Sequence, residues 1–144
     1  MTNARRLKDE AIRAFNDHDI EGLVRTFAPE AVYVSPAGTM EGREQIGWYF
    51  RHFFEGFPDL KITAWSKPTL DDPAVTEYMM TGTHDGPFLL AEGRVLAATG
   101  RHIAIRGAAV STIERGMIVA DRDYYDQLEL YSQLGLPIPA GAAV

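Results

Sequence analysis

The N-terminal part of the chain carries apolar residues at helical spacing. Its first stretch begins at Leu7 and follows the i, i+4, i+7, i+8 pattern, which predicts a helix that Thr2 or Asn3 can cap. Asp19 can cap a second, short helix. A third helix is predicted from about residue 43 to 56, and these residues give it a wide aromatic face: Ile46, Tyr49, Phe50, Phe53, Phe54 and Phe57.

After Pro58 the pattern changes from helix to strand. Apolar and polar residues then alternate, which is the periodicity of a half-buried strand. Residues 114–116 form a tight turn between two strands. The turn ends in a glycine, which readily adopts the left-handed backbone conformation that such turns require. Earlier in the chain we expect a turn at 28–30 and a loop at 38–42. The predicted strands cover residues 31–34, 60–64, 75–83, 101–114 and 117–124.

The order of these elements indicates the fold class. Helices come first, strands then follow one another through short turns, and a last helix at 125–134 ends at a glycine. This order excludes a βαβ parallel sheet and favours a segregated α+β fold. A strongly curved sheet with helices across its concave side would leave a pocket lined by aromatic residues. We expect one domain over residues 1–136 and a short apolar tail over 137–144.

Composition and charge narrow the function. The chain has 144 residues, the length of one ordinary domain. It has no cysteine, which fits a reducing cytoplasm, and its first residues lack the apolar run of a secretory signal. No stretch approaches about 18 uninterrupted apolar residues, so we expect no membrane partner. The net charge of −6 argues against nucleic acid as a partner.

Motifs for nucleotide and metal chemistry are missing. The sequence has no GxGxxG after a strand and no Walker-type loop, so we expect no nucleotide or dinucleotide cofactor. It also lacks the Gly-x-Ser-x-Gly elbow of many serine hydrolases. No metal is expected either, because the four histidines have no metal-binding spacing: His18, His52, His84 and His102.

The candidate chemistry lies in an acidic segment at residues 120–126, the end of an otherwise apolar strand. Strand alternation puts Val119, Asp121 and Asp123 on one face. The other face receives Ile118, Ala120 and Arg122. One interpretation is a solvated strand end, with Asp126 capping the last helix. In the other, one carboxylate points into the aromatic pocket, where burial raises its pKa and makes it a proton shuttle near neutral pH.

Short motifs in a fixed order carry a family resemblance. The second half contains Thr81-Gly82-Thr83-His84-Asp85-Gly86, Ala98-Thr99-Gly100-Arg101, Glu114-Arg115-Gly116-Met117-Ile118, the acidic segment and Gln133-Leu134-Gly135. The first half adds Ala14-Phe15-Asn16 and Gly42 before an aromatic helix. Over nearly the whole chain this resembles the SnoaL-like polyketide cyclases of the NTF2-like superfamily. The resemblance implies a cone with a curved mixed or antiparallel sheet, chemistry without a cofactor, and a homodimer or higher homo-oligomer formed through the outer sheet face.

The resemblance also implies a role for Asp123. The family's catalytic aspartate lies ten residues before the Gln of Gln-Leu-Gly, and counting back from Gln133 gives Asp123. In the cyclases this residue is the acid/base in an intramolecular aldol closure of a polyketide ester. It removes a proton from a carbon flanked by carbonyls, while a donor protonates the carbonyl oxygen under attack. The family's pocket histidine falls on Ala109 here, so the donor is unidentified, and His84 is one candidate for it.

The other candidate site residues concern substrate binding. Phe15, Tyr33, Trp48 and Phe53 could stack on a flat polycyclic substrate, although aromatic residues at helical spacing are more often plain core. Asp121 would raise the pKa of its neighbour if both carboxylates are buried, or would sit at the wet rim of the pocket.

Four functions therefore remain open. The leading hypothesis is a cofactor-free enzyme acting on a hydrophobic carbonyl compound, most like a polyketide cyclase. A buried carboxylate on the same cone could instead isomerise an enolisable ketone or hydrolyse an epoxide. The fourth alternative is a non-catalytic module that binds a small molecule, since a fold does not determine a function.

Overall fold

The computed structural model describes residues 3–69 and 71–137. The three predicted N-terminal helices are confirmed as α1 (Asn3–Asn16), α2 (Ile20–Arg25) and α3 (Gly42–Gly56). Asp19 caps α2 as predicted, because its carboxylate accepts the N–H of Gly22. Asn3 lies inside α1. Thr2, the other predicted cap, and the tail beyond Pro137 lie outside the described residues.

A mixed six-stranded sheet follows the helices. Its strand order is β2-β1-β8-β7-β4-β3, and all its pairs are antiparallel except β1 with β8. The parallel pair joins the N-terminal part of the chain to the last strand, which sequence periodicity does not reveal. The strands are β1 (Phe27–Ser35), β2 (Gly38–Glu41), β3 (Lys61–Thr69), β4 (Ala74–Thr83), β7 (His102–Glu114) and β8 (Met117–Tyr125).

Three segments differ from their predicted structure. The expected turn at 28–30 belongs to β1, which contains a register shift at this point. The expected loop at 38–42 forms β2 and pairs back onto β1. The long connection between β4 and β7 contains a small hairpin, made of β5 (Phe88–Leu89) and β6 (Val95–Leu96). Each of these strands is too short or too irregular to show a period of two.

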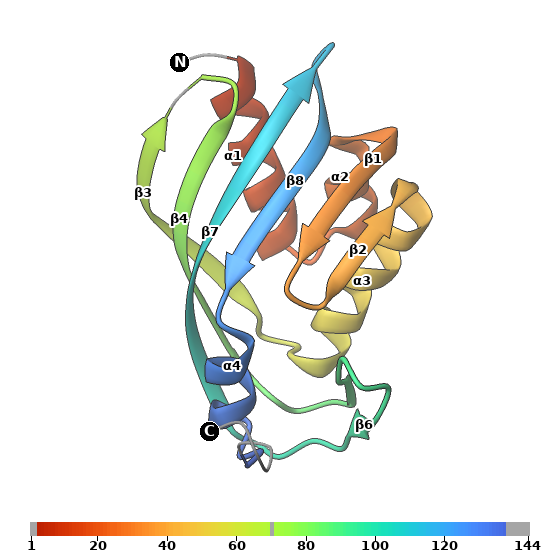
Figure 1. Cartoon of the computed structure of the whole chain (residues 1–144), viewed down its shortest axis with the longest axis vertical. Helices are drawn as coiled ribbons and strands as arrows, with labels where there is room; N and C mark the ends of the chain where they lie inside the picture. The colour runs from red at the N-terminus through yellow and green to blue at the C-terminus, as the bar shows by residue number, and fades with distance from the viewer. Residues whose placement is uncertain (1–2, 70, 138–144) are drawn as a thin grey trace, which may run out of the picture.

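Figure 1 shows the sheet curving around the helices. Helices α1, α2 and α3 lie on one side of the sheet, and α4 (Gln127–Gln133) lies at the end opposite to the N-terminus. Asp126 caps α4 as predicted, accepting the N–H groups of Leu128 and Glu129. Aromatic rings of the helices pack against the concave face, for example Phe50 of α3 on Tyr33 of β1 at 5.2 Å between ring centroids. The helices therefore close an aromatic interior over the sheet, as the α+β prediction required.

The end of the β7–β8 hairpin positions the acidic segment. Arg115 and Gly116 both have positive φ angles, 52° and 74°, which is the turn that the glycine predicted. Shortly after it, Ile113 pairs with Ile118 but Thr112 pairs with Ala120, so β8 contains one extra residue. This bulge places Ile118 in the core, so the prediction that Ile118 lies on the opposite face from Asp121 is wrong.

In residues 3–69 and 71–137, no helix is long and apolar enough to cross a membrane. The single-domain boundary at residue 136 stays a prediction.

Candidate active site

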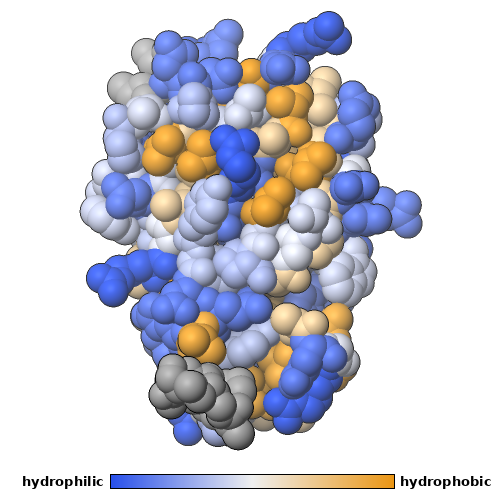
Figure 2. Space-filling model, in the orientation of Figure 1, coloured by the Kyte–Doolittle hydropathy of each residue, from blue (hydrophilic) through white to orange (hydrophobic). Residues whose placement is uncertain are grey.

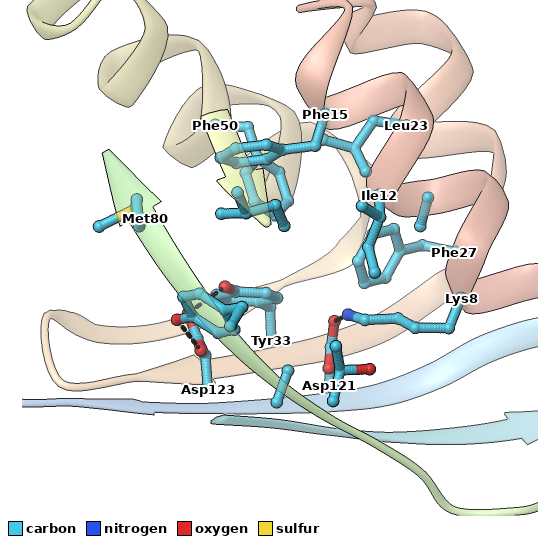
Figure 3. A pocket seen from close by; sticks show the side chains of 15 residues that line it. Lys8, Ile12, Phe15, Leu23, Phe27, Tyr33, Phe50, Met80, Asp121 and Asp123 are labelled. Carbon is cyan, nitrogen blue, oxygen red and sulfur yellow. Dashed lines mark hydrogen bonds and ion pairs between the residues drawn. The ribbon is translucent and has the colours of Figure 1, made fainter. Parts of the chain in front are cut away.

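A cavity of about 60 Å³ lies between the helices and the concave face of the sheet. Asp121 and Asp123 reach it from β8, and the rest of its wall is mostly apolar (Figure 3). The prediction that Asp121 and Asp123 share one face of the strand is confirmed, because both carboxylates line the same cavity. Apolar side chains cover the opposite wall: Ala11, Ile12, Phe15, Leu23, Phe27 and Phe50.

Two tyrosine hydroxyls hold Asp123. Tyr33 from β1 donates to one carboxylate oxygen at 2.9 Å, and Tyr78 from β4 donates to the other at 2.6 Å. The 2.6 Å distance from Tyr78 is typical of a hydrogen bond to a charged acceptor. One side of the carboxylate faces the cavity and the remainder is packed against protein atoms. Asp123 is therefore held in a fixed orientation at the edge of the cavity.

The surroundings raise the pKa of Asp123 to about 6. Burial is the largest cause, because an apolar environment disfavours the charged form. The charge of Asp121 raises the pKa further, while the two tyrosine hydrogen bonds and the charge of Lys8 lower it. A carboxyl group with this pKa can both accept and return a proton near neutral pH.

Both tyrosines stay protonated in this site. Burial, followed by the charge of Asp123, raises the pKa of Tyr33 and of Tyr78 well above the ordinary value for tyrosine. The two hydroxyls are therefore hydrogen-bond donors over the whole working range of pH.

Small residues on β7 make room for this arrangement. Gly107 pairs with Tyr78 across the strands, and a Cβ atom at position 107 would overlap the Tyr78 ring. Ala109 pairs with Asp123 and lines the cavity. Ala109, the position that the resemblance assigned to the pocket histidine, is thus the cross-strand partner of Asp123, and the hydroxyls beside this carboxylate come from β1 and β4. Tyr78 was not identified from the sequence, although a glycine inside a strand signals a close approach of this kind.

Asp121 is in a different environment, two residues away. Its side chain accepts hydrogen bonds from Lys8 Nζ at 3.0 Å and from Ser111 Oγ at 2.8 Å. The residue is only 2% exposed, so the alternative that it sits at a wet rim is wrong. Both carboxylate oxygens have partners, and Asp121 acts on the cavity mainly through its charge.

Comparison with known proteins agrees with this geometry. Residues 9–120 match the sequence model of the SnoaL-like domain family. The chain belongs to the SnoaL-like domain family. Among curated proteins, no sequence matches this one.

Solved structures place this SnoaL-like chain in the NTF2-like fold. IdmH from Streptomyces antibioticus, a proposed polyketide cyclase, is 27% identical, with a TM-score of 0.72 over 91% of this chain and 97% of IdmH. A proposed SnoaL-like polyketide cyclase from Jannaschia sp. CCS1 is 21% identical, with a TM-score of 0.77 over 96% of this chain and 98% of that chain. An NTF2-like protein of unknown function from Burkholderia pseudomallei K96243 is 19% identical, with a TM-score of 0.75 over 92% and 98%. The last two similarities concern the fold alone.

The other predicted binding residues are not all in the Asp123 cavity of this SnoaL-like domain. Phe15 and Tyr33 line it. Phe53 lines a smaller adjoining cavity that also contains Asp123. Trp48 is 47% exposed and lines a separate groove on the other side of α3. The sequence pattern could not separate these cases, because α3 carries aromatic residues on more than one side.

His84 does not meet Asp123. It is fully buried near the end of α3, between the rings of Phe57 and Phe88. Its Nδ1 atom lies 2.9 Å from Thr99 Oγ1, and it does not line the Asp123 cavity. Burial lowers the pKa of His84, as expected for an imidazole in a core.

No metal-binding cluster of three or more His, Cys, Asp or Glu side chains occurs within the part of the chain that the structure describes.

Proposed function

We propose that this SnoaL-like domain is a cofactor-free acid/base enzyme that removes a proton from the carbon next to a carbonyl group in a hydrophobic substrate. The observation that carries the proposal is the Asp123 carboxyl, which has a pKa of about 6 in an apolar cavity. At neutral pH most of this carboxyl is ionised and able to act as a base. Its pKa is still close enough to neutrality for it to return the proton later.

Tyr33 and Tyr78 complete the proposed chemistry. Proton removal next to a carbonyl places negative charge on the carbonyl oxygen, and a protonated hydroxyl beside it stabilises that charge. Both tyrosine hydroxyls lie within 2.9 Å of the Asp123 carboxylate. A carbonyl oxygen is separated by only two bonds from the hydrogen-bearing carbon, so a substrate at Asp123 brings that oxygen near the same two hydroxyls. Once Asp123 has taken the proton, one of these hydroxyls turns from the carboxyl group and donates to the substrate oxygen. A tyrosine thus takes the place of the donor that Ala109 lacks.

The favoured overall reaction is an intramolecular aldol closure. Asp123 takes the proton from a carbon flanked by carbonyls, and the resulting carbanion forms a bond to a second carbonyl carbon, whose C=O π bond breaks and leaves an alkoxide. The proton on Asp123 then passes to that oxygen through the hydroxyl of Tyr33 or Tyr78, which gives up its own proton and takes the one from Asp123, so that the carboxylate and both hydroxyls are restored. Support comes from the family and from the 27% identical IdmH, a proposed polyketide cyclase. Isomerisation of a ketone shares the first step, and it is supported by the same Asp–Tyr pairing.

Epoxide hydrolysis is less well supported. That reaction needs a second acid to protonate the leaving oxygen, and the nearest one is Asp121. Its two oxygens are already bound by Lys8 and Ser111.

The test is proton exchange at the carbon beside a ketone. The probe is a naphthyl-ethyl methyl ketone in deuterium oxide, and NMR follows the replacement of hydrogen by deuterium. Asp123→Asn should lower the catalysed rate by about 100-fold or more, the contribution expected of a general base. The matched control is Asp17→Asn, an exposed aspartate at the end of α1, which should exchange like the wild type.

Equal exchange rates in wild type and Asp123→Asn would end the proposal. If the ketone bound both proteins equally and neither accelerated exchange, the non-catalytic binding module would be the better description.

The outer face of the sheet suggests how the chain associates. Figure 2 shows apolar residues gathered over the upper part of this face. Val34 on β1 is 39% exposed, and Met117 and Tyr124 on β8 are 37% and 58% exposed. A stable dimer buries about 800 Å² on each partner, and a sheet face offers such an area. A homodimer through this face stays a prediction that light scattering can check, and so does a cytoplasmic location.

A further inference from the structure

Lys8 is an exception on the face of α1 that lies against the Asp123 cavity. Ala11 and Phe15 follow it at helical spacing, are buried and line the same cavity, and both are apolar. Lys8 is only 8% exposed. Removing an ammonium group from water is costly, and the ion pair with Asp121 at 3.0 Å offsets part of that cost. A charged residue that breaks the apolar pattern of a helix in this way is expected at a functional site.

The ammonium group has more donors than the protein uses. It carries three N–H bonds, and among the described residues its one hydrogen-bond acceptor is Asp121 Oδ2. Thr76 lines the same cavity, but its hydroxyl accepts a hydrogen bond from Arg5 at 2.9 Å. Buried donors in proteins are normally satisfied. The remaining N–H groups of Lys8 are therefore matched by something that occupies the cavity, either water or a ligand.

Lys8 and Asp123 lie apart from each other along the cavity (Figure 3). Asp121 and Asp123 are two residues apart on β8, so their side chains leave the strand roughly 7 Å apart. The ammonium lies beside Asp121, and the hydroxyls of Tyr33 and Tyr78 lie beside Asp123. A carbonyl oxygen held by the tyrosines thus leaves Lys8 for a different oxygen of the same molecule.

The charges around the cavity favour a neutral oxygen at Lys8. The charges of Lys8 and Asp121 balance each other, and Asp123 is mostly ionised at neutral pH. A ligand carboxylate would meet two carboxylates and one ammonium, so charge repulsion opposes its binding. A ketone, ester or hydroxyl oxygen accepts from the ammonium without this repulsion. Such a hydrogen bond from a charged donor is also stronger than one between neutral groups.

We propose that Lys8 is a ligand-binding residue, whose ammonium group donates a hydrogen bond to a second, neutral oxygen of the molecule whose enolisable carbonyl lies at Asp123. The site then selects molecules with two oxygens several bonds apart over molecules with one. Lys8 keeps its proton and positions the molecule rather than reacting with it. The part of the enolisable carbonyl rests on the function proposed for Asp123, whereas the hydrogen bond from Lys8 is measured by binding alone.

The test compares two ketones with the same chain of six carbon atoms. Acetonylacetone has two carbonyl groups, and butyl methyl ketone has one. NMR titration measures the dissociation constant of each for the wild type and for the double variant Lys8→Met with Asp121→Asn, which removes the ion pair without leaving a buried charge. The double variant should bind acetonylacetone about tenfold more weakly, the loss expected of one hydrogen bond to a charged donor, and butyl methyl ketone within about twofold of the wild type.

Two further variants assign the effect to Lys8. Asp121→Asn alone keeps the ammonium and carries the same asparagine, so its difference from the double variant isolates Lys8. It should bind acetonylacetone more tightly than the double variant does. Lys61→Met is the matched control, since Lys61 is an exposed lysine of β3 that does not line the cavity, and it should bind both ketones like the wild type. Urea unfolding checks that each variant is folded.

Three results would overturn the proposal. Unchanged affinity for acetonylacetone in the double variant would show that only water matches the ammonium. Equal weakening of both ketones would leave Lys8 a structural role, and the wild type might show no saturable binding of acetonylacetone at all. The exchange assay separates these failures from failure of the base. Loss of exchange in Asp123→Asn with unchanged binding in the double variant refutes only the Lys8 contact. Weakened binding of acetonylacetone in the double variant with unchanged exchange in Asp123→Asn refutes only the base.

Discussion

Asp121 and Asp123 lie on one strand, face one cavity and are separated by a single residue, yet their surroundings differ. Asp121 forms an ion pair with the Lys8 ammonium and accepts a hydrogen bond from Ser111. Asp123 has two neutral tyrosines and an apolar wall, which raises its pKa to about 6. The comparison teaches that the partners of a buried carboxylate, rather than its position in the strand, decide whether it is structural or reactive.

The largest effect on stability is expected at the paired carboxylate. Asp121→Asn leaves the Lys8 ammonium buried without its counter-charge, and breaking a buried pair costs about 3–5 kcal/mol. Urea unfolding at neutral pH measures this loss. The double variant Lys8→Met with Asp121→Asn removes both charges and should recover most of the stability. If Asp121→Asn is as stable as the wild type, Asp121 is not held by a buried ion pair.

Asp123→Asn should have the opposite effect on stability. A carboxyl whose pKa is higher in the folded state than in the unfolded chain keeps its proton between about pH 4 and 6, where the unfolded chain has lost it. Wild-type stability therefore falls as pH rises through this window. Asn does not titrate, so the variant should gain about 2 kcal/mol relative to the wild type from acid to neutral pH, allowing for partial exposure.

Urea unfolding of both proteins at several pH values measures this difference. A difference that does not change with pH would show that the pKa of Asp123 is the same in the folded and unfolded states.

The smallest expected effect concerns the donor to Asp123. Tyr78→Phe removes the 2.6 Å hydrogen bond and should slow proton exchange by about tenfold, or about 1.4 kcal/mol. It should also raise the pKa of Asp123, because that bond lowers it. Gly107→Ala should act in the same direction by displacing the Tyr78 ring. Tyr124→Phe, on the same strand as Asp123 but 58% exposed, is the control. Full activity in Tyr78→Phe would assign the donor role to Tyr33 alone.

The same comparison shows what the sequence could predict. The helices and the strands after Pro58 follow from local periodicity and capping residues. Alternation places Asp121 and Asp123 on one face, and the choice of Asp123 comes from the family resemblance, which counts it from Gln133. The environment of Asp123 does not, because Tyr33 and Tyr78 are brought to it by the parallel β1–β8 pair and by the register of β4 against β7. These are long-range pairings, and the alternation within one strand carries no information about its neighbours.

Trp48 and His84 were predicted for the site from their residue types, and the structure places both of them elsewhere. Both have side chains suited to a role beside Asp123, and neither lines that cavity. Trp48 is on a different side of α3 from Phe50, and His84 lies in the core beneath Phe88. Residue type alone could not exclude them, since the side on which a helix or loop presents a ring depends on how it packs against the sheet.

The most direct measurement is an NMR titration of the Asp123 carboxyl carbon in protein labelled at aspartate. The signal is assigned by its absence in Asp123→Asn. We predict a midpoint of about 6 for this signal. A midpoint near the value of about 3.9 for free aspartate would contradict the central claim that the cavity prepares Asp123 to exchange protons at neutral pH.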